Sequence, residues 1–173
     1  LFGSHKGAFT GAEKDREGLI KEAHLGTLFL DEVGELPQDI QGSFLRVLQE
    51  HRYRPIGSRQ EYHSDFRLIV ATNRDLDQMA EAGNFRQDLL FRLNSFTIHL
   101  PALRERTDDI QPISQYFIEN FCNHFNVPVK AGSPDFQEAL TAYQWPGNIR
   151  ELRNTMEFAV TMAKGSPTLF PIH

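Results

Sequence analysis

The stretch that decides the fold is Gly26-Thr27-Leu28-Phe29-Leu30-Asp31-Glu32, a short apolar run that ends in two carboxylates. A continuous apolar run of this length is typical of a parallel strand that is buried on both faces. Ligands of open α/β sheets bind at the carboxyl ends of the strands, so we expect Asp31 and Glu32 to lie at a ligand-binding edge. Taken alone, the pattern fits a strand that ends in an acidic turn equally well.

Residues 1–104 alternate short apolar runs with helical patterns, which indicates an α/β subdomain with a parallel sheet and covering helices. Leu68–Ala71 is a second strand candidate, and Phe96–Leu100, which ends before Pro101, is a third. Apolar residues at helical spacing within Ile40–Leu48 predict a helix between the first two strands. The polar stretch His51–Ser64 contains proline and glycine, which predicts a hairpin or a projecting loop.

The strand signal ends near Thr107, and residues 105–173 are predicted to form a small all-α subdomain. Its amphipathic helices are expected over Ile110–Phe121, Phe136–Tyr143 and Ile149–Ala163. The chain is therefore predicted to contain two domains, one over residues 1–104 and one over residues 105–173.

Composition excludes several classes of protein. The 173 residues carry 23 acidic and 18 basic side chains, a net charge of -5, which disfavours direct DNA binding by this chain. The one cysteine, Cys122, cannot form an internal disulfide, which fits a reducing cytoplasm. No apolar run is long enough for a membrane span. Because the first residue is Leu1, we expect the chain to be cut from a longer protein.

The side chains at the two strand ends suit phosphate chemistry. Asp31 can hold a magnesium ion through water, because Mg²⁺ prefers few protein oxygens plus phosphate. Glu32 can polarise a water for attack on a terminal phosphate. Asn73 follows the second strand in Ala71-Thr72-Asn73 and can orient that water, although a residue of this type at such a place more often caps a turn.

Three arginines are further candidates for contact with a nucleotide. Arg86 and Arg92 lie six positions apart and could act as arginine fingers, although most helical arginines are merely solvated. Arg150 is predicted to lie in the first turn of a helix, where a cation opposes the helix dipole. That mild cost favours a functional explanation for Arg150.

The segment Gly7–Ala12 contains no ionisable side chain, so it cannot perform acid–base chemistry. Its two glycines frame an aromatic residue and a hydroxyl, which suits a mobile loop that presents Phe9 and Thr10 to a partner. In isolation, a flexible linker would explain the same residues.

Taken together, these motifs resemble the central AAA+ domain of sigma-54-dependent transcription activators, the bacterial enhancer-binding proteins. The resemblance covers essentially the whole chain, and the motifs have the family's order and spacing. The matching segments are the GAFTGA loop (Gly7–Ala12), the Walker B strand (Leu28–Glu32), sensor I (Ala71–Asn73), the arginine-finger segment (Phe85–Arg92) and the sensor II helix (Trp145–Leu152). Arg54–Arg59 resembles the second pore loop of this family.

The resemblance implies an AAA+ P-loop ATPase of the bacterial cytoplasm that assembles as a ring, usually a hexamer, with ATP between subunits. Asp31 would bind Mg²⁺ through water, Glu32 would activate the attacking water and Asn73 would sense the γ-phosphate. Arg86 and Arg92 would act on the neighbouring subunit's nucleotide, and Arg150 would contact nucleotide from the helical lid. The residues expected to contact sigma-54 in the RNA polymerase holoenzyme are Gly7, Ala8, Phe9, Thr10, Gly11 and Ala12.

ATP hydrolysis would then remodel the closed promoter complex. Activators of this kind include response regulators of two-component systems, which bind DNA through a domain outside this chain. In the resembling family the five parallel strands run in the spatial order 5-1-4-3-2. The strands at Leu28–Leu30 and Leu68–Ala71 should therefore be neighbours.

One departure from the family is large. The GxxxxGK[ST] phosphate-binding loop and its flanking strands are not in these 173 residues, so the fold is a partial AAA+ core truncated before the GAFTGA loop, followed by a helical lid. The chain alone is expected not to hydrolyse ATP at a useful rate. The rival interpretation is a catalytically inactive module that binds sigma factor or self-assembles. A different P-loop NTPase, such as a helicase loader, is disfavoured by Gly7–Ala12.

Overall fold

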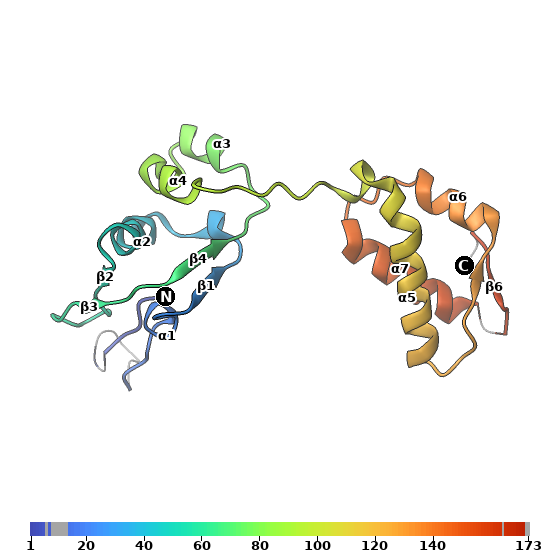
Figure 1. Cartoon of the computed structure of the whole chain (residues 1–173), viewed down its shortest axis with the longest axis horizontal. Coiled ribbons are helices and arrows are strands. Elements are labelled where there is room, and N and C mark those ends of the chain that lie inside the picture. The colour runs from blue at the N-terminus through green and yellow to red at the C-terminus, as the bar shows by residue number, and fades with distance from the viewer. Residues whose placement is uncertain (6, 8–13, 164, 172–173) are drawn as a thin grey trace. The chain divides into compact units, whose positions relative to one another are not determined.

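The computed structural model describes residues 1–5, 7, 14–163 and 165–171. They belong to two compact units, Leu1–Thr97 and Ile98–His173 (Figure 1). Each unit has its own apolar core. The division between the units falls after Thr97, seven residues before the domain boundary that the sequence predicts at residue 104.

The first unit combines short strands with helices. Its elements, in chain order, are α1 (Leu19–Glu22), β1 (Thr27–Leu30), the 3-10 helix η1 (Val33–Glu35), α2 (Gln38–Glu50), β2 (Arg52–Tyr53), β3 (Tyr62–His63), β4 (Arg67–Val70), α3 (Leu76–Glu81) and α4 (Gln87–Leu93). The helix expected within Ile40–Leu48 is α2, which extends two residues further at each end. The expected hairpin within His51–Ser64 is the antiparallel pair β2–β3. Both predictions are confirmed.

The strands β1 and β4 are hydrogen-bonded neighbours and run parallel, as predicted. Leu28 pairs with Leu68, and both pack in the core of the first unit with helix α2. Phe29 and Ile69 point to the opposite face and are 57% and 42% exposed. The expectation that these strands are buried on both faces is therefore wrong for one face, because none of the described residues covers it.

The third expected strand, Phe96–Leu100, does not form. This segment has no regular secondary structure in the described chain, and Phe96, Ile98 and Leu100 are more than two-thirds exposed. The prediction failed because a strand needs a hydrogen-bonded neighbour, which a local apolar pattern cannot supply. No described strand pairs with these residues.

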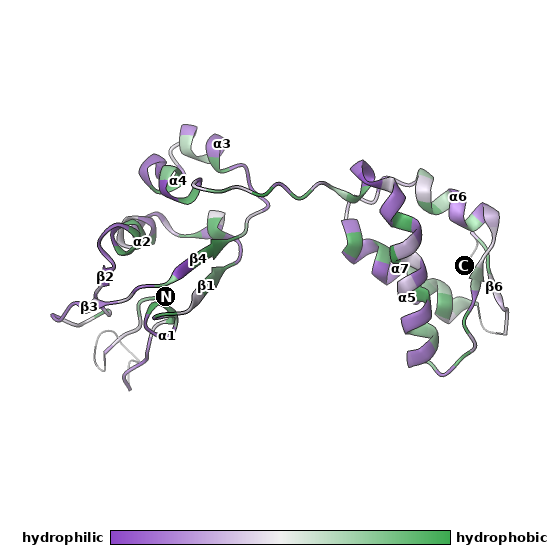
Figure 2. Cartoon of the chain, in the orientation of Figure 1, coloured by the Kyte–Doolittle hydropathy of each residue, from purple (hydrophilic) through white to green (hydrophobic). Residues whose placement is uncertain are grey.

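The second unit is mainly helical, as predicted. Its elements are η2 (Leu103–Glu105), η3 (Thr107–Asp109), α5 (Ile110–His124), β5 (Ala131–Gly132), α6 (Pro134–Ala142), α7 (Asn148–Met162) and β6 (Thr168–Leu169). Polar and apolar residues alternate around α5 and α7 (Figure 2), and the apolar faces of the two helices pack together in the core. The short strands β5 and β6 pair in parallel, so the expectation of an all-α subdomain is wrong for these four residues.

Local chemistry sets the ends of these helices. The side chain of Ser133 accepts a hydrogen bond from the amide of Phe136, and Pro134 occupies the first turn of α6, so α6 begins with a standard cap. The indole of Trp145 is buried and donates a 2.7 Å hydrogen bond to the carbonyl of Leu140. This bond fastens the turn between α6 and α7 to the end of α6.

Candidate functional site

The end of β1 forms a short loop that we name the carboxylate loop (Asp31–Leu36). The amide of Ala71 donates a 2.9 Å hydrogen bond to the carbonyl of Leu30, and the carbonyl of Ala71 accepts a 3.0 Å bond from the amide of Val33. A single residue of the neighbouring segment therefore pairs with both sides of Asp31 and Glu32. These two acidic residues stand outside the ladder, and both are exposed.

Glu32 has a left-handed backbone conformation, with φ 54° and ψ 46°. For a residue with a side chain this conformation costs about 1–2 kcal/mol. The carboxylate of Asp31 compensates in part, because its Oδ1 accepts a 3.0 Å hydrogen bond from the amide of Glu32. Strained backbone of this kind gathers at functional sites, and the sequence offered no signal of it.

The segment after β4 lies against the carboxylate loop. A side chain at Gly34 would come within 3.1 Å of the hydroxyl of Thr72 and 3.3 Å of Arg74, so the two segments are in close contact. Arg74 also forms an ion pair with Glu35. The segment that carries Asn73 and the loop that carries Asp31 and Glu32 therefore meet at one edge of the sheet.

Asp31 is a carboxylate at this edge that could hold a magnesium ion. Among the described residues, no group of three or more His, Cys, Asp or Glu side chains is placed to hold a metal ion. Magnesium is usually held by one or two carboxylates, water and substrate phosphates. The exposed carboxylate of Asp31 suits that mode, in which most oxygen ligands come from phosphate and water.

Arg86 lies immediately before α4, and its guanidinium forms a bidentate ion pair with Asp88. Its Nε and an Nη donate hydrogen bonds of 3.0 and 2.6 Å to the two carboxylate oxygens of Asp88. This charge-assisted bond raises the pKa of Arg86 and lowers the pKa of Asp88. Arg92, near the other end of α4, donates a 2.9 Å bond to the carbonyl of Leu48. The backbone amide of Arg86 bonds to the side chain of Gln41 on α2, so both arginines contact helix α2.

Gln41, on α2, was not singled out from the sequence. It is fully buried, and its carboxamide contacts the carbonyls of Leu36 and Asn84 and the amide of Arg86. A usable signal existed, because Gln41 lies three and four positions before the buried Phe44 and Leu45. A polar side chain on the buried face of a helix needs hydrogen-bonding partners, which marks it as a residue with a specific role.

Arg150 belongs to the second unit, and the structure places it only within that unit. It lies in the first turn of α7 and lines an open hollow of about 630 Å³ together with Asn154 and Phe158. The adjacent Glu151 accepts a 2.8 Å hydrogen bond from the amide of Gly147 and a 3.2 Å bond from the hydroxyl of Tyr143. The second of these bonds raises the pKa of Tyr143.

The candidate sigma-contacting segment lies mostly outside the described residues, which include Gly7 but not residues 8–13. Its base is described. Ser4 and Arg16 exchange backbone hydrogen bonds of 2.9 and 2.8 Å, and Ile56 bonds to Gly3 and to His5 at 3.0 Å each. Because Ile56 lies in the turn of the β2–β3 hairpin, this hairpin is fastened to the root of the segment.

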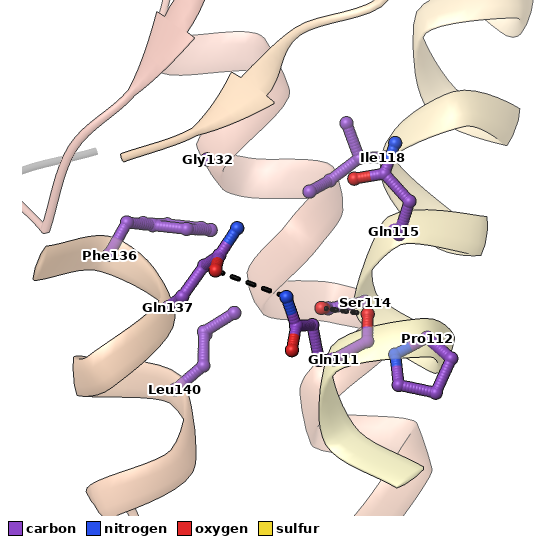
Figure 3. A pocket seen from close by; sticks show the side chains of 9 residues that line it. All are labelled: Gln111, Pro112, Ser114, Gln115, Ile118, Gly132, Phe136, Gln137 and Leu140. Carbon is purple, nitrogen blue, oxygen red and sulfur yellow. Dashed lines mark hydrogen bonds between the residues drawn. The ribbon is translucent and has the colours of Figure 1, made fainter. Parts of the chain in front are cut away.

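The second unit has another hollow, of about 310 Å³, between α5 and α6. Figure 3 shows the side chains of Gln111 and Gln137 meeting across it, where their amides form a 3.1 Å hydrogen bond. Phe136 and Leu140 line its wall. None of the candidate residues named from the sequence lines this hollow.

No helix in the described parts of the chain is both long and apolar enough to cross a membrane.

Two protein families match the chain, one in each of its two units. Residues 1–99 match the Sigma-54 interaction domain family, and residues 104–169 match the AAA+ ATPase lid domain family. The chain is 48% identical over 165 residues to the transcriptional regulatory protein ZraR of Klebsiella oxytoca. It is 46% identical over 170 residues to the regulatory protein AtoC of Escherichia coli K12. These alignments cover 95% and 98% of the chain but 37% of each relative.

Solved structures of relatives have the same fold as this chain. The chain is similar to NtrX of Brucella abortus with a TM-score of 0.90 and 31% identity, over 99% of this chain and 39% of that one. NtrX in complex with ATP matches with a TM-score of 0.82 and 34% identity, over 87% of this chain and 34% of that one. The chain has the fold of a partial AAA+ core with a helical lid, and it belongs to the Sigma-54 interaction domain family.

Proposed function

We propose that this chain is the larger part of an ATP-driven module that remodels the closed complex of the sigma-54 RNA polymerase holoenzyme. ATP and Mg²⁺ are its cofactors, and copies of the module form a ring, a hexamer, in the bacterial cytoplasm. Its parent is a transcription regulator of the two-component type, which contacts DNA through another domain. NtrX, a similar protein, has been solved with ATP and with ADP.

The roles of the residues follow from their chemistry. Asp31 holds Mg²⁺ through water, Glu32 activates the attacking water and Asn73 orients it near the γ-phosphate. Arg86 and Arg92 stabilise charge on the nucleotide of the neighbouring subunit. Arg150 contacts the nucleotide from the lid, which residues 105–173 form.

One observation carries the proposal. The carboxylate loop stands out of the ladder beside the segment of Asn73, so acidic and amide side chains gather at the carboxyl edge of a parallel pair. Ligands of α/β sheets bind at this edge. The GAFTGA segment transmits the motion to sigma-54, because Phe9 and Thr10 can contact a partner protein without contacting the phosphates.

The proposal is tested in a chimera in which this chain replaces the matching segment of E. coli AtoC. Thr10→Ala should leave most ATPase activity and abolish open-complex formation, because Thr10 contacts sigma-54 and not the nucleotide. A steady-state phosphate-release assay and an open-complex assay on the same preparation decide it. Normal open-complex formation by Thr10→Ala would refute the role of the loop.

The unsubstituted chimera is the reference. If it binds sigma-54 but hydrolyses no ATP, the inactive sigma-binding module is the better description of this chain. The 173-residue chain alone should show no useful turnover, because positioning of the phosphates supplies most of the catalysis in phosphoryl transfer.

A further inference from the structure

We propose that Gln41 is a positioning residue that ties the carboxylate loop to Arg86 within one subunit. It thereby couples the nucleotide site of a subunit to the site that the same subunit completes in its neighbour. This inference rests on the proposed function, in which Glu32 acts on the subunit's own nucleotide and Arg86 on the next one.

The contacts of Gln41 point in two directions. Its Nε2 donates a 2.8 Å hydrogen bond to the carbonyl of Leu36, the last residue of the carboxylate loop, and a longer 3.3 Å bond to the carbonyl of Asn84. Its Oε1 accepts a 2.8 Å bond from the amide of Arg86. One side chain therefore holds both the loop of Glu32 and the start of α4.

The carboxamide is suited to this place because it must donate and accept at the same time. Two carbonyl oxygens and one amide N–H surround it, which only one orientation of the amide satisfies. Gln41 is fully buried, so water cannot replace a lost partner. Removal of the amide leaves Leu36, Asn84 and Arg86 with polar groups that need new partners.

The loop of Glu32 is thereby anchored at both ends. Ala71 holds its first half through bonds to Leu30 and Val33, and Gln41 holds its last residue, Leu36. A shift of Glu32 when its nucleotide changes state moves Leu36, and Gln41 transmits that displacement to the backbone of Arg86. Coupling between two sites can travel through a chain of hydrogen-bonded groups, and these residues form one.

Mixed rings test the coupling. In the AtoC chimera, a mixture of Glu32→Gln and Arg86→Ala subunits should regain activity, because an Arg86→Ala subunit supplies Glu32 and its Glu32→Gln neighbour supplies Arg86. Gln41→Met removes the amide with little change in volume. If Gln41 positions both groups, Gln41→Met should lower kcat about ten-fold or more, with a smaller change in KM.

Neither partner should then rescue Gln41→Met. Mixed with Glu32→Gln it still supplies a displaced carboxylate loop, and mixed with Arg86→Ala it still supplies a displaced Arg86. Rescue by either partner would overturn the coupling, and so would normal activity of Gln41→Met alone. Failure of the Glu32→Gln and Arg86→Ala mixture would instead refute the proposed function, because Glu32 and Arg86 would not act from different subunits.

A direct measurement on the 173-residue chain does not depend on activity. In Gln41→Met, the amide of Arg86 should exchange its hydrogen about ten-fold faster or more, because its acceptor is lost. Gln38→Met is the matched control, since Gln38 lies on the same helix and bonds to Gly83 but not to Arg86 or Leu36. Unchanged exchange at Arg86 in a folded Gln41→Met chain would refute the proposal.

Gln41→Glu separates the two halves of the amide at a pH where the new carboxyl is ionised. The carboxylate keeps an acceptor for Arg86 but loses the donor to Leu36. Arg86→Ala should therefore rescue Gln41→Glu in a mixed ring, and Glu32→Gln should not. Rescue by both partners, or by neither, would contradict the assignment of Nε2 to the carboxylate loop and of Oε1 to Arg86.

Discussion

Phe29 and Ile69 are register partners in the parallel pair β1–β4, and both lie on the face that the described residues leave uncovered. Parallel sheets are normally covered on both faces. Phe29 and Ile69 are 57% and 42% exposed, and no further described strand joins either edge of the pair, so this surface favours association.

We therefore expect the isolated 173-residue chain to self-associate and to bind an apolar dye. Phe29→Ser should reduce both, because it removes the larger of the two exposed side chains. Sedimentation velocity and dye fluorescence measure the change. The control is Phe158→Ser, which removes an equally large and similarly exposed (59%) side chain from α7 of the second unit. Equal effects of the two substitutions would show that the exposed face of β1–β4 does not drive the self-association.

Glu32→Gln should retain nucleotide binding and lower the rate of ATP hydrolysis about 100-fold or more in the AtoC chimera, because the amide keeps the shape but cannot act as a base. Equilibrium binding and phosphate release measure the two effects. Glu35→Gln is the matched control, since Glu35 lies in the same loop but pairs with Arg74. Hydrolysis at the unsubstituted rate by Glu32→Gln would show that Glu32 is not the base.

Asp31→Ala should raise the Mg²⁺ concentration that the chimera requires for half-maximal hydrolysis. The reason is that Asp31 offers an exposed carboxylate at the strand end and Mg²⁺ binds through such oxygens and water. A magnesium titration of the hydrolysis rate measures it. An unchanged magnesium requirement would remove Asp31 from the metal site.

Asp88 should titrate below its ordinary range, because Arg86 bonds to both of its carboxylate oxygens and lowers its pKa. Its folded-state pKa is depressed, so the stabilisation from the pair is complete above about pH 3.9, the unfolded value, and is lost as the pH falls through the folded pKa. The contribution is small, since both side chains are about half exposed.

Carbon-13 NMR of the carboxyl group of Asp88 measures this pKa. Arg86→Gln should raise it toward the ordinary value, whereas Arg92→Gln should not, because Arg92 bonds to the carbonyl of Leu48 instead. A carboxyl pKa that is unchanged by Arg86→Gln would mean that the pair does not persist in solution.

Gly147→Ala should destabilise the second unit by about 1–3 kcal/mol. A side chain at Gly147 would lie 2.8 Å from Cβ of Glu151, too close for α7 to begin as it does. Because Trp145 is the single tryptophan, its fluorescence during thermal unfolding reports on this unit alone. The midpoint should fall by about 4–8 °C for each kcal/mol lost.

Gly26→Ala serves as the control, since its new methyl group would make only an ordinary 3.4 Å contact in the other unit. It should leave the transition at Trp145 unchanged. Equal stability of Gly147→Ala and the unsubstituted chain would show that the start of α7 can shift without cost.

The elements that sequence alone determined are those whose stability is local. Helices α2, α5, α6 and α7 follow from apolar spacing over several turns. The pairing of β1 with β4 followed from the family resemblance. The candidate residues Asp31, Glu32 and Asn73 follow from strand ends, because parallel strands present their carboxyl ends at one edge.

Only the tertiary structure decided the features that depend on distant partners. Phe96–Leu100 has a strand-like sequence but forms no strand, because hydrogen-bonded pairing is set by neighbours that a local pattern does not contain. The left-handed Glu32 arises because Ala71 bonds on both sides of the acidic pair. Gln41 gains its place in the same way, since Leu36 and Arg86 meet its amide only once the chain has folded.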